Sequence, residues 1–331
     1  MLLALLRRYV RPYRRLVAAV MALQTLSTLA ALYLPTVNAA IIDDGVAAGD
    51  TALIGRLGLV MLAVTGLQGV CAVGAVYFGS RTGMGLGRDL RSAVFERVIG
   101  FSEHETARFS APSLLTRTTN DVQQIQVLVQ MTVTVGVTAP IMCVGGIAMA
   151  IHLDAGLSWL LGISVPVLAL ANYLIVSRML PVFRSMQRLI DGINRVLRDQ
   201  LSGIRVVRAF AREPYERDRF AVANHAVSDA ALTAGRWQAL MLPVTTLTVN
   251  ISSVALIWFG GLRIDAGQMQ VGALIAFLAY FMQILMAVLM ATLLLVMLPR
   301  ASVCAERITE VLATQSAITA PAVPRRPSDG I

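Results

Sequence analysis

Few side chains in this sequence could perform covalent or metal chemistry. The three histidines and three cysteines are widely separated, and their spacing matches neither a zinc site nor a disulfide framework. All 28 basic residues are arginine, and no lysine is present. A phosphate-binding loop of the Walker type needs a lysine ammonium beside the β- and γ-phosphates. We therefore expect no ATPase site, no catalytic residue, no metal site and no bound cofactor in this chain.

Charged side chains alternate in two short segments that could contact another protein. The first segment contains Glu103, Glu105 and Arg108, and the second contains Arg212, Glu213, Glu216, Arg217, Asp218 and Arg219. Tyr215 lies inside the second segment and is an amphipathic aromatic of the kind that anchors protein interfaces. Taken alone, the pattern is explained more simply as a solvated helix face with ordinary salt bridges.

The composition indicates that these segments are attached to a membrane domain. Hydrophobic residues make up 56% of the 331 residues and charged residues only 14%, with a mean hydropathy of +0.70. Soluble globular chains average roughly 45–50% apolar residues. The chain is therefore predicted to be an all-α membrane protein, because spanning backbone must satisfy its own hydrogen bonds.

Six apolar stretches contain no Asp, Glu, Lys, Arg or His, and each is long enough to cross a bilayer as a helix. The predicted spans are residues 16–42, 57–80, 127–151, 155–177, 239–262 and 271–298. The first is too long for the apolar segment of a cleavable signal peptide. Without an ionisable relay inside these spans, a proton- or sodium-driven carrier is disfavoured.

Arginine placement predicts the orientation. The N-terminal tail, residues 81–126, residues 178–238 and the C-terminal tail hold all the arginines except Arg56 and Arg263. The positive-inside rule therefore places both termini and both long loops in the cytoplasm. The net charge of +9 then suits the anionic face of the cytoplasmic (inner) membrane and its lipids, not nucleic acid. Apolar spacing in the two loops predicts long helical extensions.

Polar and aromatic residues inside the spans are candidates for a translocation cavity. They are Gln24, Gln130, Asn250, Phe277, Tyr280 and Gln283. Such polar residues more often form hydrogen bonds between helices. An uncharged cavity would suit lipophilic or amphipathic cargo.

Four strings carry a family resemblance. Residues 112–122 read PSLLTRTTNDV, and residues 201–210 read LSGIRVVRAF and are followed by Glu213 and Phe220. Residues 258–261 read WFGG and precede Gln268, Met269 and Gly272, and residues 305–308 read AERI before Val311 and Leu312. In this order and spacing they resemble the transmembrane domain of type I ABC exporters, closest to the heterodimeric, multidrug-exporter-like branch.

The resemblance implies a type 1 transmembrane domain over residues 1–318 and a linker over 319–331 toward a nucleotide-binding domain that this sequence lacks. It further implies that ATP and magnesium bind at that partner or missing domain, and that a second six-span half, more often non-identical, completes an ATP-hydrolysing translocase with alternating access. Coupling to the ATPase domain would fall on Glu105, Arg108, Phe109, Arg212, Glu213, Tyr215 and Glu216. A six-span channel or sensor without ATP coupling is the alternative, and cargo, transport direction and subunit composition are left open.

Overall fold

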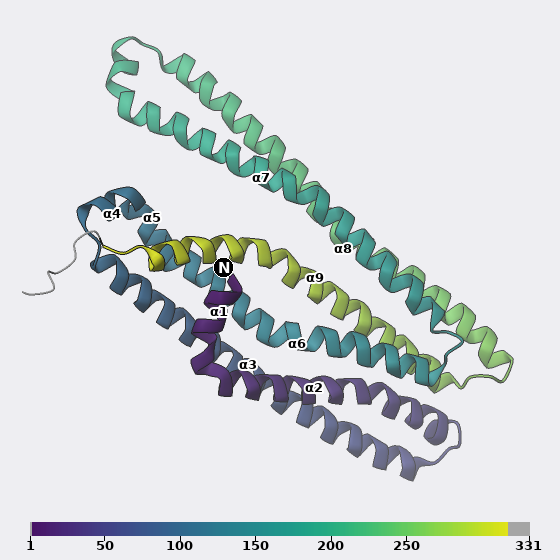
Figure 1. Ribbon diagram of the computed structural model, residues 1–331. Helices are drawn as coiled ribbons and strands as arrows, with labels where there is room; N and C mark the ends of the chain where they lie inside the picture. Colours follow the sequence, from purple (N-terminus) through teal and green to yellow (C-terminus); the bar gives the residue numbers. More distant parts are fainter. Residues whose placement is uncertain (1, 317–331) are drawn as a thin grey trace, which may run out of the picture. The chain divides into compact units, whose positions relative to one another are not determined.

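The computed structural model describes residues 2–316, and every regular element in that part of the chain is helical (Figure 1). The predicted 319–331 linker lies outside these residues. Six helical stretches are long and apolar enough to cross a membrane. The helices are α1 Leu2–Val10, α2 Arg14–Ala40, α3 Thr51–Ile99, α4 Glu103–Phe109, α5 Ala111–Thr116, α6 Val122–Leu153, α7 Trp159–Ala209, α8 Glu213–Asp265 and α9 Val271–Ala313.

The two long loops are helical, as their apolar spacing predicts. Helix α3 continues well beyond the second predicted span to Ile99, and α7 and α8 continue the fourth and fifth spans as 51- and 53-residue helices. The fourth helix starts at Trp159, later than the predicted start at residue 155. The reason is local: the Asp154 carboxylate accepts a 2.9 Å hydrogen bond from the Leu157 amide, which holds the chain in a turn.

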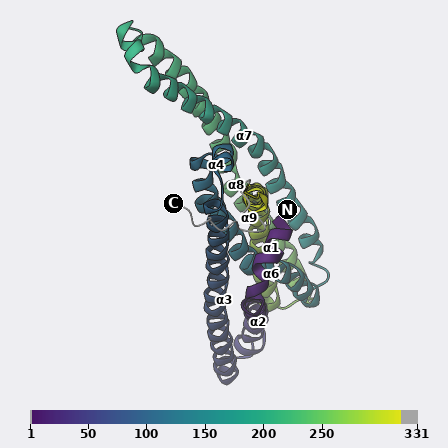
Figure 2. The same ribbon diagram turned by 60° about the vertical axis from the view of Figure 1, so that its left-hand side comes forward.

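The described part of the chain divides into two compact units, residues 2–153 with 269–316, and residues 154–268. In the first unit α2 packs along α3 and α6 packs along α9, and α6 also contacts α2 and α3 (Figures 1 and 2). The second unit is a hairpin of α7 and α8, which pack against each other. Many large apolar side chains remain on the surface: Leu59, Leu62, Val70 and Val73 of α3 are 69–72% exposed. Such a surface suits lipid as the solvent.

Glycines let α3 and α6 approach closely within the first unit. Gly79, Gly83 and Gly87 are four residues apart, so they share one face of α3. A Cβ atom at Gly83 would lie 3.3 Å from the Gln126 carbonyl oxygen, and one at Gly87 would overlap the Gln126 side-chain amide. Small residues at such positions are what close packing of membrane helices requires.

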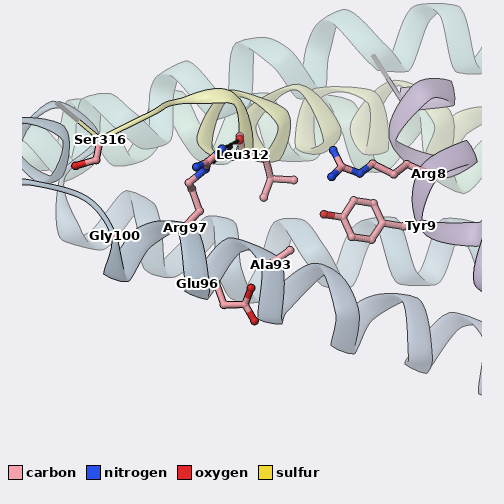
Figure 3. A pocket seen from close by; sticks show the side chains of 8 residues that line it. All are labelled: Arg8, Tyr9, Ala93, Glu96, Arg97, Gly100, Leu312 and Ser316. Carbon is pink, nitrogen blue, oxygen red and sulfur yellow. Dashed lines mark hydrogen bonds between the residues drawn. The ribbon is translucent and has the colours of Figure 1, made fainter. Parts of the chain in front are cut away.

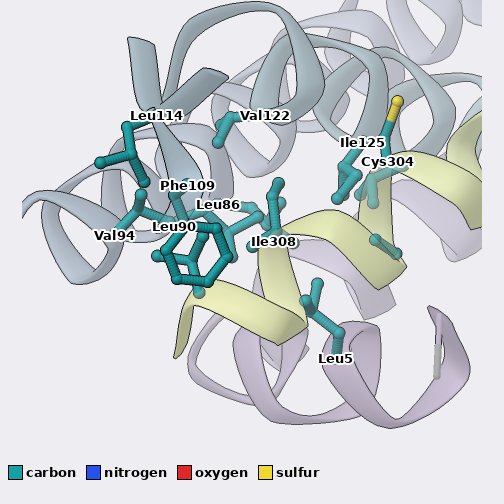
Figure 4. Close-up of a cluster of buried hydrophobic side chains, with 13 residues drawn as sticks. Leu5, Leu86, Leu90, Val94, Phe109, Leu114, Val122, Ile125, Cys304 and Ile308 are labelled. Atoms are coloured by element: carbon teal, nitrogen blue, oxygen red, sulfur yellow. The ribbon is translucent and has the colours of Figure 1, made fainter. Parts of the chain in front are cut away.

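A hydrophobic cluster closes the end of the first unit where α4 and α5 lie, which we call the arm end (Figure 4). Helices α1, α3, α4, α5, α6 and α9 all contribute to it. Its members are Leu5, Leu86, Leu90, Val94, Phe109, Leu114, Val122, Ile125, Val129, Cys304, Ala305, Ile308 and Val311. The last turns of α9 are therefore packed against the segment that connects α3 to α6.

Candidate coupling site

Helix α4 is fixed in place by its own N-terminal cap. The Glu105 carboxylate accepts hydrogen bonds from the Ser102 amide at 2.8 Å and from the Ser102 hydroxyl at 2.5 Å. This reciprocal arrangement satisfies backbone donors that the first helical turn would otherwise leave unpaired. Glu105 is consequently buried, with only 4% of its surface exposed. Its carboxylate therefore caps the helix, and its role in coupling stays a prediction.

Phe109, the last residue of α4, is also buried. Its ring stacks on Phe101 with centroids 5.8 Å apart. The guanidinium of Arg117 lies 4.9 Å from the ring centroid, and that of Arg108 lies 5.4 Å away. Cations at these distances are attracted to the electron-rich ring face. Of the three residues predicted at this tip, Arg108 alone has an exposed side chain, at 60%.

The joint between α4 and α5 has an unusual backbone. Ser110 adopts φ 60° and ψ 142°, a region that residues with a Cβ atom rarely occupy and that costs roughly 1–3 kcal/mol. The surrounding structure holds it there, because the Ser110 amide bonds to the Thr106 carbonyl and its own carbonyl accepts from Leu114. The joint therefore sets a fixed angle between α4 and α5.

Arg117 connects this tip to α9. Its Nη1 donates to the Arg307 carbonyl oxygen and to the Glu310 carboxylate, both at 2.8 Å. Arg108 also approaches Glu310, at 3.7 Å. Farther along, Asp121 pairs with the Arg307 guanidinium at 3.3 Å. We call Arg117, Asp121, Arg307 and Glu310 the α9 clasp.

Arg97 holds the very end of α9. Its Nε and Nη2 donate to the Leu312 carbonyl oxygen at 3.2 and 3.0 Å. A cation at this position satisfies a carbonyl that has no helical partner and complements the helix dipole. Together with the α9 clasp, it fixes the segment that precedes residue 316 to α3 and to the α4–α5 tip.

The two halves of the α9 clasp come from segments far apart in the sequence, and their pairing was not predicted. Arg117 and Asp121 belong to the 112–122 string, and Arg307 belongs to the AERI string. The sequence does contain a signal for this pairing, because each segment carries one basic and one acidic residue at similar spacing. Asp121 follows Arg117 by four positions, and Glu310 follows Arg307 by three. Spacing on a helix shows which residues share a face, but not which distant helix that face meets.

Cys304 lies beside the α9 clasp. Burial raises the pKa of its thiol to about 11, and the neighbouring Asp121 carboxylate adds to the rise. The thiol is therefore neutral at physiological pH and behaves as a small apolar group.

The second charged segment begins at the turn between α7 and α8, which we call the α7–α8 tip. Ala211 has φ 51°, and Arg212 is the residue before α8, whose first turn contains Glu213 and Glu216. Negative charges there are stabilised by the positive end of the helix dipole. Gln200 donates to the Glu216 carbonyl at 2.9 Å and to its carboxylate at 3.2 Å.

Exposed aromatic residues distinguish this second tip. Tyr215 is 61% exposed, in agreement with its predicted availability, and Phe210 is 74% exposed. Phe210 was not predicted as a contact residue, although it ends the 201–210 string directly before this turn. Arg219 ties the two helices together through Asp199 at 3.2 Å and Glu216 at 3.5 Å. The tip is thus a braced turn with two outward aromatic rings.

The residues predicted to line a cavity mostly join helices instead. Phe277 and Tyr280 are fully buried, so neither borders an open cavity. The Tyr280 hydroxyl bonds to the Leu32 carbonyl and to the Thr36 hydroxyl, both at 2.6 Å. The remaining contacts are Gln24 to Thr138 at 2.5 Å, Gln130 to Ser80 at 3.1 Å and Gln283 to the Ala31 carbonyl at 3.4 Å. Asn250 is exposed on α8.

Comparison with known proteins decides the family of this helical arrangement. Residues 17–288 match the family described as ABC transporter transmembrane region. The chain belongs to that family. This ABC transporter transmembrane domain is a multi-pass membrane protein.

The relatives of this transmembrane domain are longer proteins. An uncharacterized ABC transporter ATP-binding protein of Mycobacterium tuberculosis (strain ATCC 25618 / H37Rv) is 75% identical over all 331 residues, which make up 57% of its length. One from Bacillus subtilis (strain 168) is 28% identical over 93% of this chain and 54% of its own. A fatty acid ABC transporter ATP-binding/permease protein of Mycobacterium bovis is 30% identical over 60% of this chain and 32% of its own. The chain thus spans little more than half of the relatives that match it most fully.

Proposed function

We propose that this chain is the transmembrane half of an ATP-driven exporter of the cytoplasmic membrane, with both termini inside the cell. A nucleotide-binding domain, carrying ATP and magnesium, would contact the α4–α5 tip and the α7–α8 tip. Closure of that domain would move the spans between inward- and outward-facing states. A second six-span half, more often a non-identical chain, would complete the pathway.

The α9 clasp is the observation that supports this proposal best. Force applied at the α4–α5 tip would reach α9 through Arg117 and Asp121, because both pair with residues on the last turns of that helix. The hydrophobic cluster beneath the clasp resists deformation, since well-packed side chains transmit strain. A push at the tip would therefore move the spans as well as the loop.

Lipophilic or amphipathic cargo fits the spans best. The six predicted spans contain no Asp, Glu, Lys, Arg or His, so a charged solute would cross without a compensating charge. A relative at 30% identity is called a fatty acid ABC transporter ATP-binding/permease protein, and a cargo of that chemical class agrees with the uncharged spans. Cargo of this kind would be released to the outer leaflet or to the medium.

The decisive experiment uses the protein together with its ATPase domain, reconstituted in vesicles. Tyr215→Ala at the α7–α8 tip should leave basal ATP hydrolysis within about twofold but abolish most ATP-dependent efflux of a lipophilic dye. Leu232→Ala is the matched control, because Leu232 is also exposed on α8 but lies several turns from the tip. Equal efflux by both variants would refute coupling through Tyr215, and ATP-independent flux would favour a channel.

Topology is tested separately. A single cysteine introduced in place of Tyr215 should react with a membrane-impermeant maleimide in inverted vesicles and remain unlabelled in intact cells. Labelling from outside the cell would place the α7–α8 tip on the wrong side and would refute the proposed orientation.

A further inference from the structure

Five arginines lie from the last turn of α1 to the first turn of α2, and no acidic residue occurs before Asp43. They are Arg7, Arg8, Arg11, Arg14 and Arg15, and all five are exposed. Among residues 2–316, none of them forms an ion pair with a carboxylate, although six other arginines do. This group, which we call the N-terminal arginine cluster, is therefore an uncompensated patch of positive charge.

The fold bends the chain so that these arginines surround shared space. Helix α1 ends at Val10, and a short 3-10 turn at Arg11–Tyr13 changes the chain direction before α2 starts (Figure 1). Pro12 favours this break, because proline cannot donate the next helical hydrogen bond. Tyr13 fixes the bend by donating a 2.7 Å hydrogen bond to Asp89 of α3.

Two hollows border the cluster. One, of about 750 Å³, is lined by Leu3, Ala4, Arg7, Arg8 and Arg11. The other, of about 530 Å³, is lined by Arg8, Arg11, Pro12, Arg14 and Arg15. Arg8 and Arg11 border both, so a ligand in either hollow would meet these two guanidinium groups. Both volumes fall within the roughly 300–1,000 Å³ of small-molecule sites.

A third hollow beside Arg8 has different chemistry. It measures about 330 Å³ and lies between α1, α3 and α9, with Glu96 and Arg97 on its wall (Figure 3). The Glu96 carboxylate would repel an anion there, and Arg97 already donates to the Leu312 carbonyl. We therefore assign anion binding to the other two hollows, in which arginines are the only charged lining residues.

The position of the cluster relative to the first span identifies the anion. Arg15 directly precedes the predicted span, and Arg11 lies five residues before Leu16, in the turn that leads into α2. Lipid headgroups occupy this depth beside the hydrocarbon core. Leu3 is 81% exposed on the same hollow as Arg7, which gives the site an apolar edge for a glycerol backbone or acyl chain.

We propose that the N-terminal arginine cluster is a binding site for the headgroup of an anionic phospholipid, with Arg8 and Arg11 as the central pair. Arginine suits this role because its planar fork can donate two parallel hydrogen bonds to one phosphate. The bound lipid would hold α1 at the membrane surface. Because Leu5 of α1 belongs to the arm-end cluster, occupancy would also stabilise the packing around the end of α9. The placement of this lipid in the cytoplasmic leaflet rests on the orientation proposed above.

The test uses native mass spectrometry to measure the lipid that the purified full chain retains. Binding of dioleoylphosphatidylglycerol is compared with binding of dioleoylphosphatidylcholine. The double variant Arg8→Gln/Arg11→Gln should bind phosphatidylglycerol at least about tenfold more weakly. Arg178→Gln/Arg236→Gln is the matched control, because it removes two exposed arginines close to predicted spans. Equal loss in both double variants, or no loss in the first, would overturn the site.

Two further arms make the result specific. Millimolar inorganic phosphate should leave the bound lipid in place, whereas displacement would assign the arginines to a soluble anion and overturn the lipid proposal. If the glutamine variant does not fold, Arg8→Lys/Arg11→Lys replaces it in the assay. This variant keeps both positive charges but loses the planar guanidinium groups, so we expect it to bind the lipid several-fold more weakly. Unchanged binding would show attraction by charge alone and would overturn a specific site. The assay contains no ATP and has no sidedness, so its outcome is independent of transport and orientation.

Discussion

Arg117 donates a 2.8 Å hydrogen bond to Glu310, which lies 193 residues later in the chain. The same nitrogen also donates to the Arg307 carbonyl, and the guanidinium covers one face of Phe109. Its side chain is only 11% exposed, whereas that of Glu310 is 45% exposed. One buried cation thus joins the connection between α3 and α6 to the last turns of α9.

Replacing Arg117 should cost more stability than replacing its acidic partner. Arg117→Gln leaves the Arg307 carbonyl and the Phe109 ring without their cation, so we expect a loss of about 2–4 kcal/mol in the free energy of unfolding. Glu310→Gln should cost about 1 kcal/mol or less, because the carboxylate is half exposed. Denaturant unfolding in detergent would measure both, and the double variant would give the coupling energy.

Glu306→Gln is the control for the α9 clasp. Glu306 lies one turn before Glu310 on the same helix and is exposed, and it forms none of the ion pairs found in residues 2–316. Its replacement should change stability by less than about 0.5 kcal/mol. If Arg117→Gln were no more harmful than Glu306→Gln, the clasp would have no energetic importance.

At the opposite end of the first unit, Gly272 should not tolerate a side chain. The Asp43 carboxylate caps α9 by accepting from the amides of Gly272 at 2.6 Å and Ala273 at 3.1 Å. A Cβ atom at Gly272 would lie 2.5 Å from the Ala39 carbonyl oxygen and 2.6 Å from the Asp43 carboxylate. Gly272→Ala must therefore displace either backbone or cap, at about 1–3 kcal/mol.

Gly261→Ala provides the comparison, since a Cβ atom at Gly261 would meet no atom within 4 Å. Alanine favours the helix over glycine, so this variant should be neutral or slightly stabilising. Thermal unfolding of the two variants side by side would show whether crowding at Gly272, and not glycine replacement in general, is responsible. A Gly272→Ala protein as stable as the parent would contradict the cap.

The sequence predicts the helices far better than it predicts their partners. The absence of Asp, Glu, Arg, Lys and His from six stretches predicted the spans, because charge in hydrocarbon is costly. The burial of Glu105 and Phe109 could not be predicted, because alternating charge does not reveal it: the Glu105 carboxylate accepts from Ser102, and two guanidinium groups lie near the Phe109 ring. The bond from the Tyr280 hydroxyl to the Leu32 carbonyl could not be predicted either, because a hydroxyl that faces a cavity has the same sequence pattern.

In the second unit, Asp154 should be needed to close the α7–α8 hairpin. Its carboxylate accepts from the Leu157 amide at 2.9 Å and from Arg263 Nε at 3.0 Å, and only 5% of the side chain is exposed. In Asp154→Asn, the remaining side-chain oxygen can still accept from the Leu157 amide, but an NH2 group then faces Arg263 in place of the second carboxylate oxygen. Because the Arg263 side chain is one third exposed and can rehydrate, we expect a loss of about 1–3 kcal/mol.

Asp265→Asn is the control for this pair, since Asp265 ends the same helix as Arg263 and forms none of the ion pairs found among the described residues. Limited proteolysis of the 154–158 turn would report local opening. Asp154→Asn should be cleaved faster than both the parent and Asp265→Asn. Equal cleavage of all three proteins would mean that the ion pair does not hold the turn.

Cys304 should resist alkylation up to strongly alkaline pH. Burial, with the Asp121 carboxylate beside it, raises the pKa of the thiol from its usual 9.0 to about 11. Since the thiolate is the nucleophile, its population and the reaction rate near pH 8 should be roughly a hundredfold below those of an ordinary thiol. In a variant with Cys71 and Cys143 replaced by alanine, iodoacetamide labelling followed by mass spectrometry would measure the rate.

Val303→Cys in a background without other cysteines is the matched comparison, because position 303 is 56% exposed on the same helix turn. Its labelling should level off once pH exceeds about 9, whereas labelling of Cys304 should keep rising toward pH 11. A raised folded-state pKa also means that the neutral thiol stabilises the fold below pH 9 and that this contribution is lost as pH rises through 11. The protein should therefore lose stability in that alkaline window, and Cys304→Ala should lose less. Identical labelling profiles at the two positions would show that the last turns of α9 open freely and that the packing around the α9 clasp does not persist in solution.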